Sequence, residues 1–312
     1  MSKIPAEPFV IIDGSSYLFR AYHALPPLIN DQQQPTGAMF GVVSMLRNNI
    51  ERYKPKYLAM VFDYKGKNFR HELFPEYKAN RLVTPEDLMV QFLPLNAIIR
   101  AMGIKIIIVP KVEADDVIAT LATLAKEKNI PTVISTSDKD LAQLVDESTI
   151  LVNTMSDYVM DIPGVMAKFS VNASQIVDYL TLIGDTVDNI PGVPKCGPKT
   201  AVKWLQEYGT LDNLLANADK ISGKVGEYLR AAADLLPLYK ELIIVRRDLN
   251  LEMGPEDFVI GEPDTSALAL LYKEYNFKLW LKELEANNTP RLMPLVESLL
   301  PINILNKRVP SL

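Results

Sequence analysis

Short runs of apolar, largely β-branched residues alternate with helical patterns through the first half of the chain. The runs that predict strands are residues 9–13, 57–63, 104–109, 131–136 and 149–154, and helices are predicted near 37–52, 86–101 and 112–122. Near-continuous apolar strands separated by helices are typical of a parallel sheet covered on both faces. The pattern therefore predicts a doubly wound α/β domain.

The strand signal fades from about residue 160, and helical patterns dominate the rest of the chain. Breaks that contain proline or glycine fall at 163–164, 191–198 and Gly223. The expected divisions are an α/β domain over 1–170, a helical domain over 171–265, and terminal helices with a tail over 266–312. The tail from Ala286 has little periodicity, so we expect it to be a linker or a loosely docked segment.

The composition excludes several classes of protein. With 312 residues, 48% of them hydrophobic, the chain can bury a large core. The single cysteine, Cys196, excludes an internal disulfide framework, and the two histidines give no spacing typical of a zinc site. The apolar run near the start is too short for a signal peptide, and no later run approaches a membrane span. We therefore expect a bacterial cytoplasmic protein that does not bind membranes.

Net charge alone argues weakly against a nucleic-acid partner, because phosphate binding favours a basic surface. The chain has 33 basic and 38 acidic residues, a balance of −5. The acids that we expect in one cleft number nine, and without them the balance is 33 − 29 = +4. The acidic total therefore reflects one concentrated cleft and does not exclude DNA.

Acidic residues follow the predicted strands at the point where each strand ends. They are Asp13, Asp63, Glu113, Asp115, Asp116, Asp138 and Asp140. Open parallel sheets bind ligands outside the carboxyl ends of their strands, so these side chains are expected to share one cleft. One such acid is most often an N-cap or turn residue. A group of them at one edge would repel strongly unless cations were present.

Hard divalent cations would relieve that repulsion. Magnesium prefers oxygen ligands and keeps waters and substrate phosphate oxygens in its shell. Two such ions about 4 Å apart are the usual arrangement for cutting phosphodiesters. The stretch LIGDTVDNIPG adds Asp185 and Asp188 on one face of a turn, although this pair alone would be interpreted as a cap. The pattern predicts a two-metal site whose acids act directly or through water.

The stretch IPGVPKCGPKTAVKWL, residues 190–205, indicates a helix-hairpin-helix clamp for the DNA backbone. Glycines let the backbone approach phosphates, and N–H groups at a helix start bind them without reading sequence. The predicted contacts are Gly192, Lys195, Gly197, Lys199, Thr200 and Lys203. The alternative is an ordinary corner between helices with solvated lysines. Trp204 and Val202 are expected in the core.

Residues 64–85, between Asp63 and the next predicted helix, interleave basic and aromatic side chains. Lys78 and Arg81 stand at i and i+3, so they would project together and could hold the scissile phosphate. The alternative is a solvated surface loop. Tyr77 could stack on a base or pack against the protein, and the sequence leaves both alternatives open.

These motifs together resemble a known family. The stretches FVIIDGSSYLFRAYHALPPL, TGAMFGV, VFDYKGKNFRHELFPEYKANR, VEADDVIATLA, STSDKDLAQLV and GDTVDNIPGVPKCGPKTA are similar to the 5'-nuclease domain of bacterial DNA polymerase I, within the flap-endonuclease superfamily. The resemblance covers residues 8–285. It implies a PIN-like or resolvase-like sheet and a metal-dependent 5'-3' exonuclease and flap endonuclease that removes primers and displaced 5' strands.

The resemblance also implies roles for single residues. The first metal site would use Asp13, Asp63, Glu113, Asp115 and Asp116, and the second Asp138, Asp140, Asp185 and Asp188. Residues 64–85 would form an arch whose Lys78 and Arg81 contact phosphate, and residues 184–205 would form the hairpin. The implied cofactors are two Mg²⁺ ions, which Mn²⁺ can replace, with K⁺ at the hairpin. The implied partners are DNA with a free 5' end (a flap, a nick or an RNA-primed strand) and a separate DNA polymerase, for a nucleoid-associated monomer.

Two features depart from the family pattern. Cys196 and Pro198 stand where the family more often has a small apolar residue and an acid, which could weaken K⁺ binding or alter the grip on duplex. The chain also ends at Leu312, without the proofreading and polymerase domains of full-length relatives. Competing interpretations are a non-catalytic DNA-binding module and an RNA-processing nuclease. The first would have no use for the acids at the strand ends, and the second lacks the hairpin.

Overall fold

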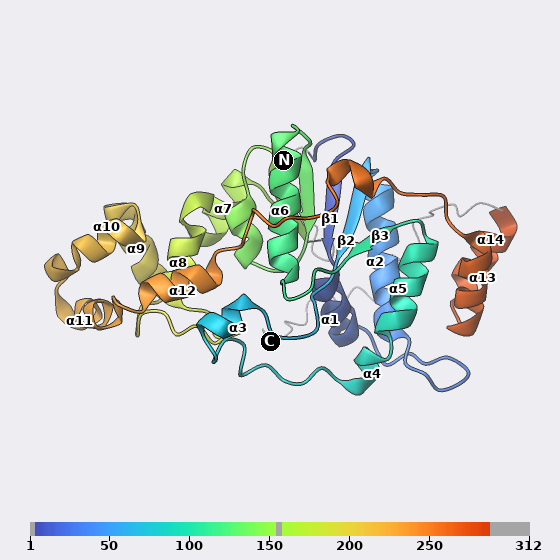
Figure 1. Ribbon diagram of the computed structural model, residues 1–312, viewed down its shortest axis with the longest axis horizontal. Coiled ribbons are helices and arrows are strands. Elements are labelled where there is room, and N and C mark those ends of the chain that lie inside the picture. The colour runs from blue at the N-terminus through green and yellow to red at the C-terminus, as the bar shows by residue number, and fades with distance from the viewer. Residues whose placement is uncertain (1–3, 154–157, 288–312) are drawn as a thin grey trace.

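The computed structural model describes residues 4–153 and 158–287, and Figure 1 shows a mixed sheet at its centre. The strands are β1 (Phe9–Asp13), β2 (Tyr57–Val61), β3 (Lys105–Ile107), β4 (Thr132–Ser135), β5 (Thr149–Asn153) and β6 (Tyr158–Met160). They lie in the order β3-β2-β1-β4-β5-β6. All pairs are parallel except β5 with β6. The mainly parallel sheet that the sequence predicts is confirmed.

Helices surround the sheet and continue beyond it. Those up to residue 169 are α1 (Gly14–Ala24), α2 (Gly37–Tyr53), α3 (Phe69–Leu73), α4 (Glu86–Met89), α5 (Phe92–Ala101), α6 (Ala114–Glu127) and α7 (Ile162–Phe169). The later ones are α8 (Ile176–Ile183), α9 (Pro198–Tyr208), α10 (Leu211–Ala216), α11 (Gly223–Ala232), α12 (Leu236–Ile243), α13 (Thr265–Glu274) and α14 (Lys278–Asn287). Short 3₁₀ turns are η1 (Asp140–Leu144), η2 (Ala173–Gln175), η3 (Ala218–Lys220) and η4 (Pro255–Phe258).

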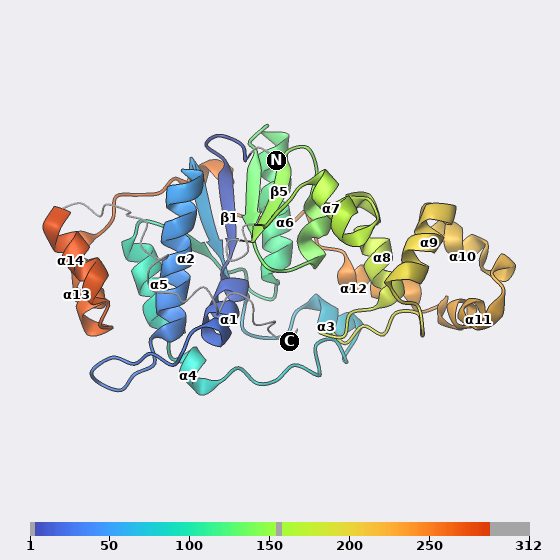
Figure 2. The same cartoon turned by 180° about the vertical axis from the view of Figure 1, so that it is seen from behind.

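Each face of the sheet has its own core, because successive side chains of a strand point to opposite faces. In β1, Phe9 and Ile11 belong to the core that α6 covers, and this core continues into α8 to α12. Val10 and Ile12 belong to the core under α1, α2, α5, α13 and α14. Figures 1 and 2 show α6 and α2 on opposite faces. The strand is therefore buried on both sides, as its unbroken apolar run predicts.

The helical domain extends from one end of the sheet, and α13 and α14 lie at the other end (Figure 1). Trp280 of α14 stacks on Phe40 of α2, with ring centroids 4.8 Å apart and an interplanar angle of 10°. Arg47 of α2 pairs with Glu283 of α14 at 2.6 Å. These contacts hold α14 on the sheet domain. The predicted tail beyond residue 287, like Thr154 of the predicted fifth strand, lies outside the described residues.

Local differences from the predicted elements have local causes. Neither α1, which begins directly after β1, nor β6 was predicted from the sequence. The helix predicted over 86–101 is two helices, α4 and α5, because Pro94 has no N–H to bond the carbonyl of Val90. Gln91, buried between them, accepts a hydrogen bond from Met39 N at 3.1 Å. Within the described ranges, no helix has the length and apolar character needed to cross a membrane.

Candidate active site

Hydrogen bonds tie together the loops at the carboxyl edge of the sheet. Asp13 ends β1, and its Oδ1 accepts from Ser16 N at 2.9 Å, which caps α1. Its Oδ2 accepts from Thr136 Oγ1 at 2.7 Å, just beyond β4. Asp63, beyond β2, accepts from Ala114 N at 2.8 Å, where α6 begins. Since β1 and β4 are neighbours from which the chain winds in opposite directions, Asp13 lies at the topological switch point of the sheet.

Asp115 lies among the acids of this edge. Its pKa is raised well above the usual value, first by burial and then by the charges of Asp138, Asp13 and Asp63. Burial also raises the pKa of Asp13 to about 7, with contributions from the charges of Asp63 and Asp138. Carboxylates that raise one another's pKa in this way are close enough to repel. The structure thus brings together acids from four loops.

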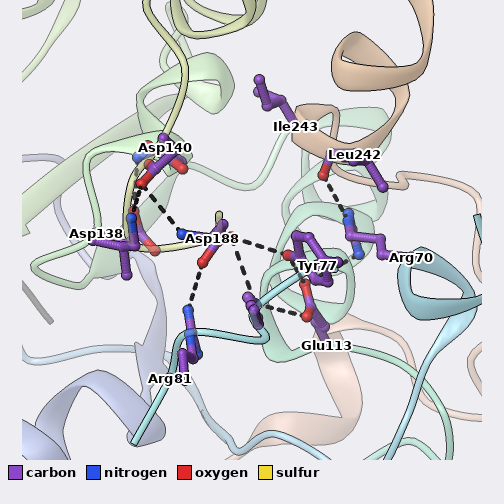
Figure 3. A network of polar contacts seen from close by, with 12 residues as sticks. Arg70, Tyr77, Arg81, Glu113, Asp138, Asp140, Asp188, Leu242 and Ile243 are labelled. Carbon is purple, nitrogen blue, oxygen red and sulfur yellow. Dashed lines mark hydrogen bonds and ion pairs between the residues drawn. The ribbon is translucent and has the colours of Figure 1, made fainter. Parts of the chain in front are cut away.

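A second group contains Asp138, Asp140, Asp185 and Asp188. Figure 3 shows Asp138 and Asp140 beside Asp188. The pKa of Asp140 is raised well above its usual value, first by burial and then by the charges of Asp138 and Asp185. The Oδ1 atom of Asp140 is buried and has no hydrogen-bond partner among the described residues. A buried carboxylate oxygen without a donor is a suitable ligand for a cation.

Basic side chains of the protein pair with acids of the cleft. Lys78 Nζ lies 2.7 Å from Glu113 Oε1, and Arg81 Nη2 lies 2.7 Å from Asp188 Oδ1. Lys139 Nζ similarly lies 3.0 Å from Asp185 Oδ2. In this arrangement, no three acids within 4–153 and 158–287 form a group that could hold a metal ion directly. The donor set therefore fits hard cations that are held in part through water.

Glu113 is the acid most closely surrounded by the arch segment (Figure 3). Burial acts to raise the pKa of Glu113, but the charges of Lys78 and Arg70 lower this pKa to about 2. Asn68 Nδ2 donates to its Oε1 at 2.8 Å, and the Tyr77 hydroxyl lies 3.1 Å from its Oε2. Glu113 therefore fixes the arch segment beside the cleft, and its role as a metal ligand stays a prediction.

Asp116 lies in a buried ion pair, and its expected role as a metal ligand stays a prediction. It is 0% exposed, and its two oxygens accept hydrogen bonds from Arg70 Nη1 and Nη2, each at 2.7 Å. Oδ1 also accepts from Arg246 N at 2.8 Å. Successive residues of a helix point about 100° apart, so Asp116 can face Arg70 while Asp115 faces the other acids. Asp116 is a structural ion-pair partner in this fold.

Tyr77 packs against the protein, which corrects its place among the expected DNA contacts. The side chain is 2% exposed, and its hydroxyl also lies 3.0 Å from Asp188 Oδ2. Its ring meets that of His71 edge to face at 5.4 Å. A ring that is covered on this scale has no face on which a base could stack. The packing alternative is therefore the correct one of the two.

The predicted hairpin joins α8 to α9. Asp185 and Ile190 exchange backbone hydrogen bonds of 2.8 and 2.7 Å, which close its first turn. The side chains of Lys195, Lys199 and Lys203 are exposed, and Thr200 is partly buried at the start of α9. Gly197 is the N-cap of α9, and Pro198 occupies its first turn. Cys196 is buried like a small apolar residue, and burial raises its pKa to about 12.

Gly192 gives the hairpin its closest backbone approach. Its φ is +64°, and a Cβ there would lie 2.3 Å from Gly184 N. We expect Gly192→Ala to lower the free energy of unfolding by about 2–5 kcal/mol, from the left-handed backbone and the clash together. Gly223→Ala is the matched control, because Gly223 has φ +81° but open space around it, so about 1–2 kcal/mol is expected. Equal losses in urea unfolding would contradict the close approach.

Two family models cover most of the chain. Residues 8–170 match the 5'-3' exonuclease N-terminal resolvase-like domain, and residues 171–266 match the 5'-3' exonuclease C-terminal SAM fold. The 5'-3' exonuclease of Aquifex aeolicus is 39% identical over 275 residues, which cover 88% of this chain and 94% of that protein. The chain belongs to the 5'-3' exonuclease family.

Another relative of this exonuclease is longer. DNA polymerase I of Pseudomonas aeruginosa is 47% identical over 285 residues, which cover 89% of this chain but only 31% of that protein. The chain therefore spans about a third of that polymerase and nearly all of the Aquifex exonuclease. Members of the family are nucleases that hydrolyse phosphodiester bonds.

Solved structures share the fold of this exonuclease. T5 5'-exonuclease with bound zinc ions superposes with a TM-score of 0.65 at 21% identity, covering 87% of this chain and 98% of that one. The catalytic core of Rad2 in complex with DNA substrate gives a TM-score of 0.59 at 18% identity, covering 86% and 87%. The resolvase-like sheet followed by a helical domain is thus shared with both proteins.

The sequence analysis missed several side chains that organise the site of this exonuclease. Asn68 and Arg70 hold Glu113 and Asp116, Thr136 holds Asp13, and Lys139 pairs with Asp185. Lys139 stands between two predicted ligands, so its position was a usable signal. A hydroxyl directly after a strand, as at Thr136, was a weaker one. Arg70 has no local signal, because its partners lie far away along the chain.

Proposed function

We propose that this exonuclease cuts DNA as a divalent-metal-dependent 5'-3' exonuclease and flap endonuclease. The observation that carries the proposal is the position of Asp115, which is buried among acids from three other loops, so that burial first and then their charges raise its pKa. Such a concentration of carboxylates needs cations. This group of acids lies at the switch point of the sheet. Lys78 and Arg81, the predicted phosphate contacts, border it.

Two magnesium ions are the proposed cofactors, with manganese as a substitute. Asp13, Asp63 and Asp115 would hold one, and the buried free oxygen of Asp140 supports a second beside Asp138 and Asp185. When bound, such ions activate water and stabilise the leaving oxygen of a phosphodiester. We propose K⁺ for the hairpin as well, from the family resemblance. The T5 exonuclease was solved with zinc ions and the Rad2 core with DNA substrate, which supports a divalent cation and a DNA substrate for this fold.

The chain itself would bind and orient the substrate. Lys78 and Arg81 can exchange their acid partners for phosphate oxygens once divalent cations neutralise these acids, because both make charge-assisted hydrogen bonds that phosphate oxygens can also accept. The hairpin and the start of α9 would grip the backbone of the duplex without reading its sequence. The proposed substrate is a flap, nick or RNA-primed strand with a free 5' end. A separate DNA polymerase as partner, a monomeric state and a cytoplasmic location stay predictions.

Cleavage of defined DNA substrates tests the proposal. Duplexes with a 5' flap, a nick or a blunt end, labelled at the 5' end, are incubated with the protein in Mg²⁺ or in chelator. We expect flap and nick cutting that needs the metal. Binding without cleavage would instead support a non-catalytic module, and cutting only of RNA substrates would support an RNA-processing nuclease.

The hairpin lysines provide a separate test of the DNA grip. We expect Lys199→Ala with Lys203→Ala to weaken binding of every duplex sequence alike, because backbone contacts carry no sequence information. The slope of log K against log salt should become shallower by about 0.9 for each phosphate contact that is lost. Fluorescence anisotropy over a salt range of roughly 50 to 200 mM measures both effects. An unchanged slope would contradict the assignment.

A further inference from the structure

Arg70 and Asp116 form a buried ion pair where the arch segment meets α6. Arg70 is 2% exposed and Asp116 is 0% exposed. Two parallel hydrogen bonds of 2.7 Å join the guanidinium to the carboxylate. A bidentate pair of this kind fixes orientation as well as distance. Figure 3 shows Arg70 on the far side of Glu113 from Asp138 and Asp140.

The same guanidinium reaches the helical domain. Arg70 Nε donates to the carbonyl oxygen of Leu242 at 2.8 Å, and Nη2 donates to that of Ile244 at 3.0 Å. Asp116 Oδ1 accepts from Arg246 N, and the Arg246 guanidinium lies 3.6 Å from the centroid of the Phe69 ring. The pair therefore joins the base of the arch, α6 and the segment after α12. Breaking it would leave buried polar groups unpaired.

A series of backbone hydrogen bonds leads from Arg70 to the turn that carries Lys78. Phe74 N donates to Arg70 O at 2.9 Å, and Tyr77 N donates to Phe74 O at 2.9 Å. Lys78 follows directly, and its N–H donates to Asp188 O at 3.1 Å. Backbone hydrogen bonds thus connect Arg70 to the turn that carries Lys78.

We propose that Asp116 and Arg70 are positioning residues that set the place of Lys78 and Arg81 over the cleft, and that Asp116 binds no metal. Because Arg70 holds Leu242 and Ile244, this joint also links the helical domain, which carries the hairpin, to the phosphate-binding side chains. The inference rests on the proposed nuclease function and adds a positioning role within it. A displacement of reacting groups by about 1 Å can cost on the order of 100-fold in rate.

Asp116→Asn and Asp115→Asn separate positioning from metal binding. We expect Asp116→Asn to lower the single-turnover cleavage rate at saturating Mg²⁺ by about 100-fold. The Mg²⁺ concentration that gives the half-maximal rate should stay within about twofold of that of the unsubstituted protein. The Mn²⁺ affinity, measured by electron paramagnetic resonance without DNA, should do the same. Asp115→Asn should weaken Mn²⁺ binding. Lys126→Ala is the matched control, because Lys126 lies at the far end of the same helix and forms an exposed ion pair with Asp146. This substitution should leave both readouts unchanged.

Two further variants keep the test decisive if Asp116→Asn is unstable. Arg70→Lys keeps the charge but loses the planar fork, so its rate should fall while Mn²⁺ binding persists. In a background with both Lys78→Ala and Arg81→Ala, Asp116→Asn should reduce the rate by less than about threefold, because the changes then remove the same contribution.

The outcomes distinguish a failure of the positioning role from a failure of the proposed nuclease function. If the unsubstituted protein cleaves DNA but Asp116→Asn raises the Mg²⁺ requirement and loses Mn²⁺ binding as Asp115→Asn does, the positioning role is refuted and the function stands. Full additivity with Lys78→Ala and Arg81→Ala together would also refute it. Failure of the unsubstituted protein to cleave any substrate would overturn the function and this inference together.

Discussion

Asp115→Asn is expected to lower the rate of metal-dependent cleavage by about 1,000-fold, the upper range for removing one group that stabilises a transition state. The charges of Asp138, Asp13 and Asp63 all act on Asp115, so its carboxylate belongs to the most concentrated part of the cleft. Removal of this carboxylate should weaken cation binding more than removal of an acid at the edge of the group would. Single-turnover cleavage of a 5'-flap duplex measures the rate, and anisotropy in chelator should give a DNA affinity within about threefold of the original.

The same substitution is expected to stabilise the metal-free protein. The folded state raises the pKa of Asp115, so it binds more protons than the unfolded state, and stability falls as pH rises through the raised pKa. An asparagine does not contribute to this loss. Asp115→Asn should therefore raise the free energy of unfolding, with a larger gain at alkaline than at acidic pH.

Glu127→Gln is the matched control for Asp115→Asn, because Glu127 is an exposed acid at the other end of α6. It should change neither the cleavage rate nor the pH dependence of unfolding. A normal cleavage rate for Asp115→Asn would remove the main support for the metal cleft. A loss of stability in chelator would show that the acids do not repel as the raised pKa values indicate.

The sequence predicted which strand ends bring acids together, because strand ends are encoded locally. The unbroken apolar run of β1 stops at Asp13, and in a parallel sheet every strand end lies at one edge. The hairpin was equally accessible, since Gly192 and Pro198 mark its turn and the start of α9 through their own backbone preferences. Both predictions depend on a few neighbouring residues.

The roles of adjacent acids were harder to predict. Asp115 and Asp116 look equivalent along the chain, and only the rotation of α6 directs one to the cleft and the other to Arg70. The partners of Arg70 include Leu242 and Ile244, more than 170 residues away along the chain. Tyr77 was left open for the same reason, because its burial depends on Glu113 and Asp188. Contacts between distant segments need the fold before they can be assigned.

Lys78→Ala is the second variant for which we expect a large loss of activity. Lys78 Nζ lies 2.7 Å from Glu113 Oε1 and 3.7 Å from Asp188 Oδ2, so it stands between the start of α6 and the hairpin side of the acidic group. A cation there can stabilise the charge that develops on a phosphate. We expect kcat to fall by about 100-fold or more, with a smaller change in KM, because the interaction strengthens in the transition state. Steady-state cleavage of a nicked duplex measures both constants.

The backbone of Lys78 requires a control of its own, because φ is +56° and alanine in a left-handed conformation costs about 1–2 kcal/mol. Lys54 offers one: it is an exposed lysine with φ +44° that ends α2, at the edge of the sheet away from the cleft. Lys54→Ala should share the backbone cost and retain full kcat. If both variants lost activity equally, the loss would come from backbone strain. If Lys78→Ala kept its kcat, the cation beside Glu113 would not serve the reaction, and the ion pair would be a structural contact only.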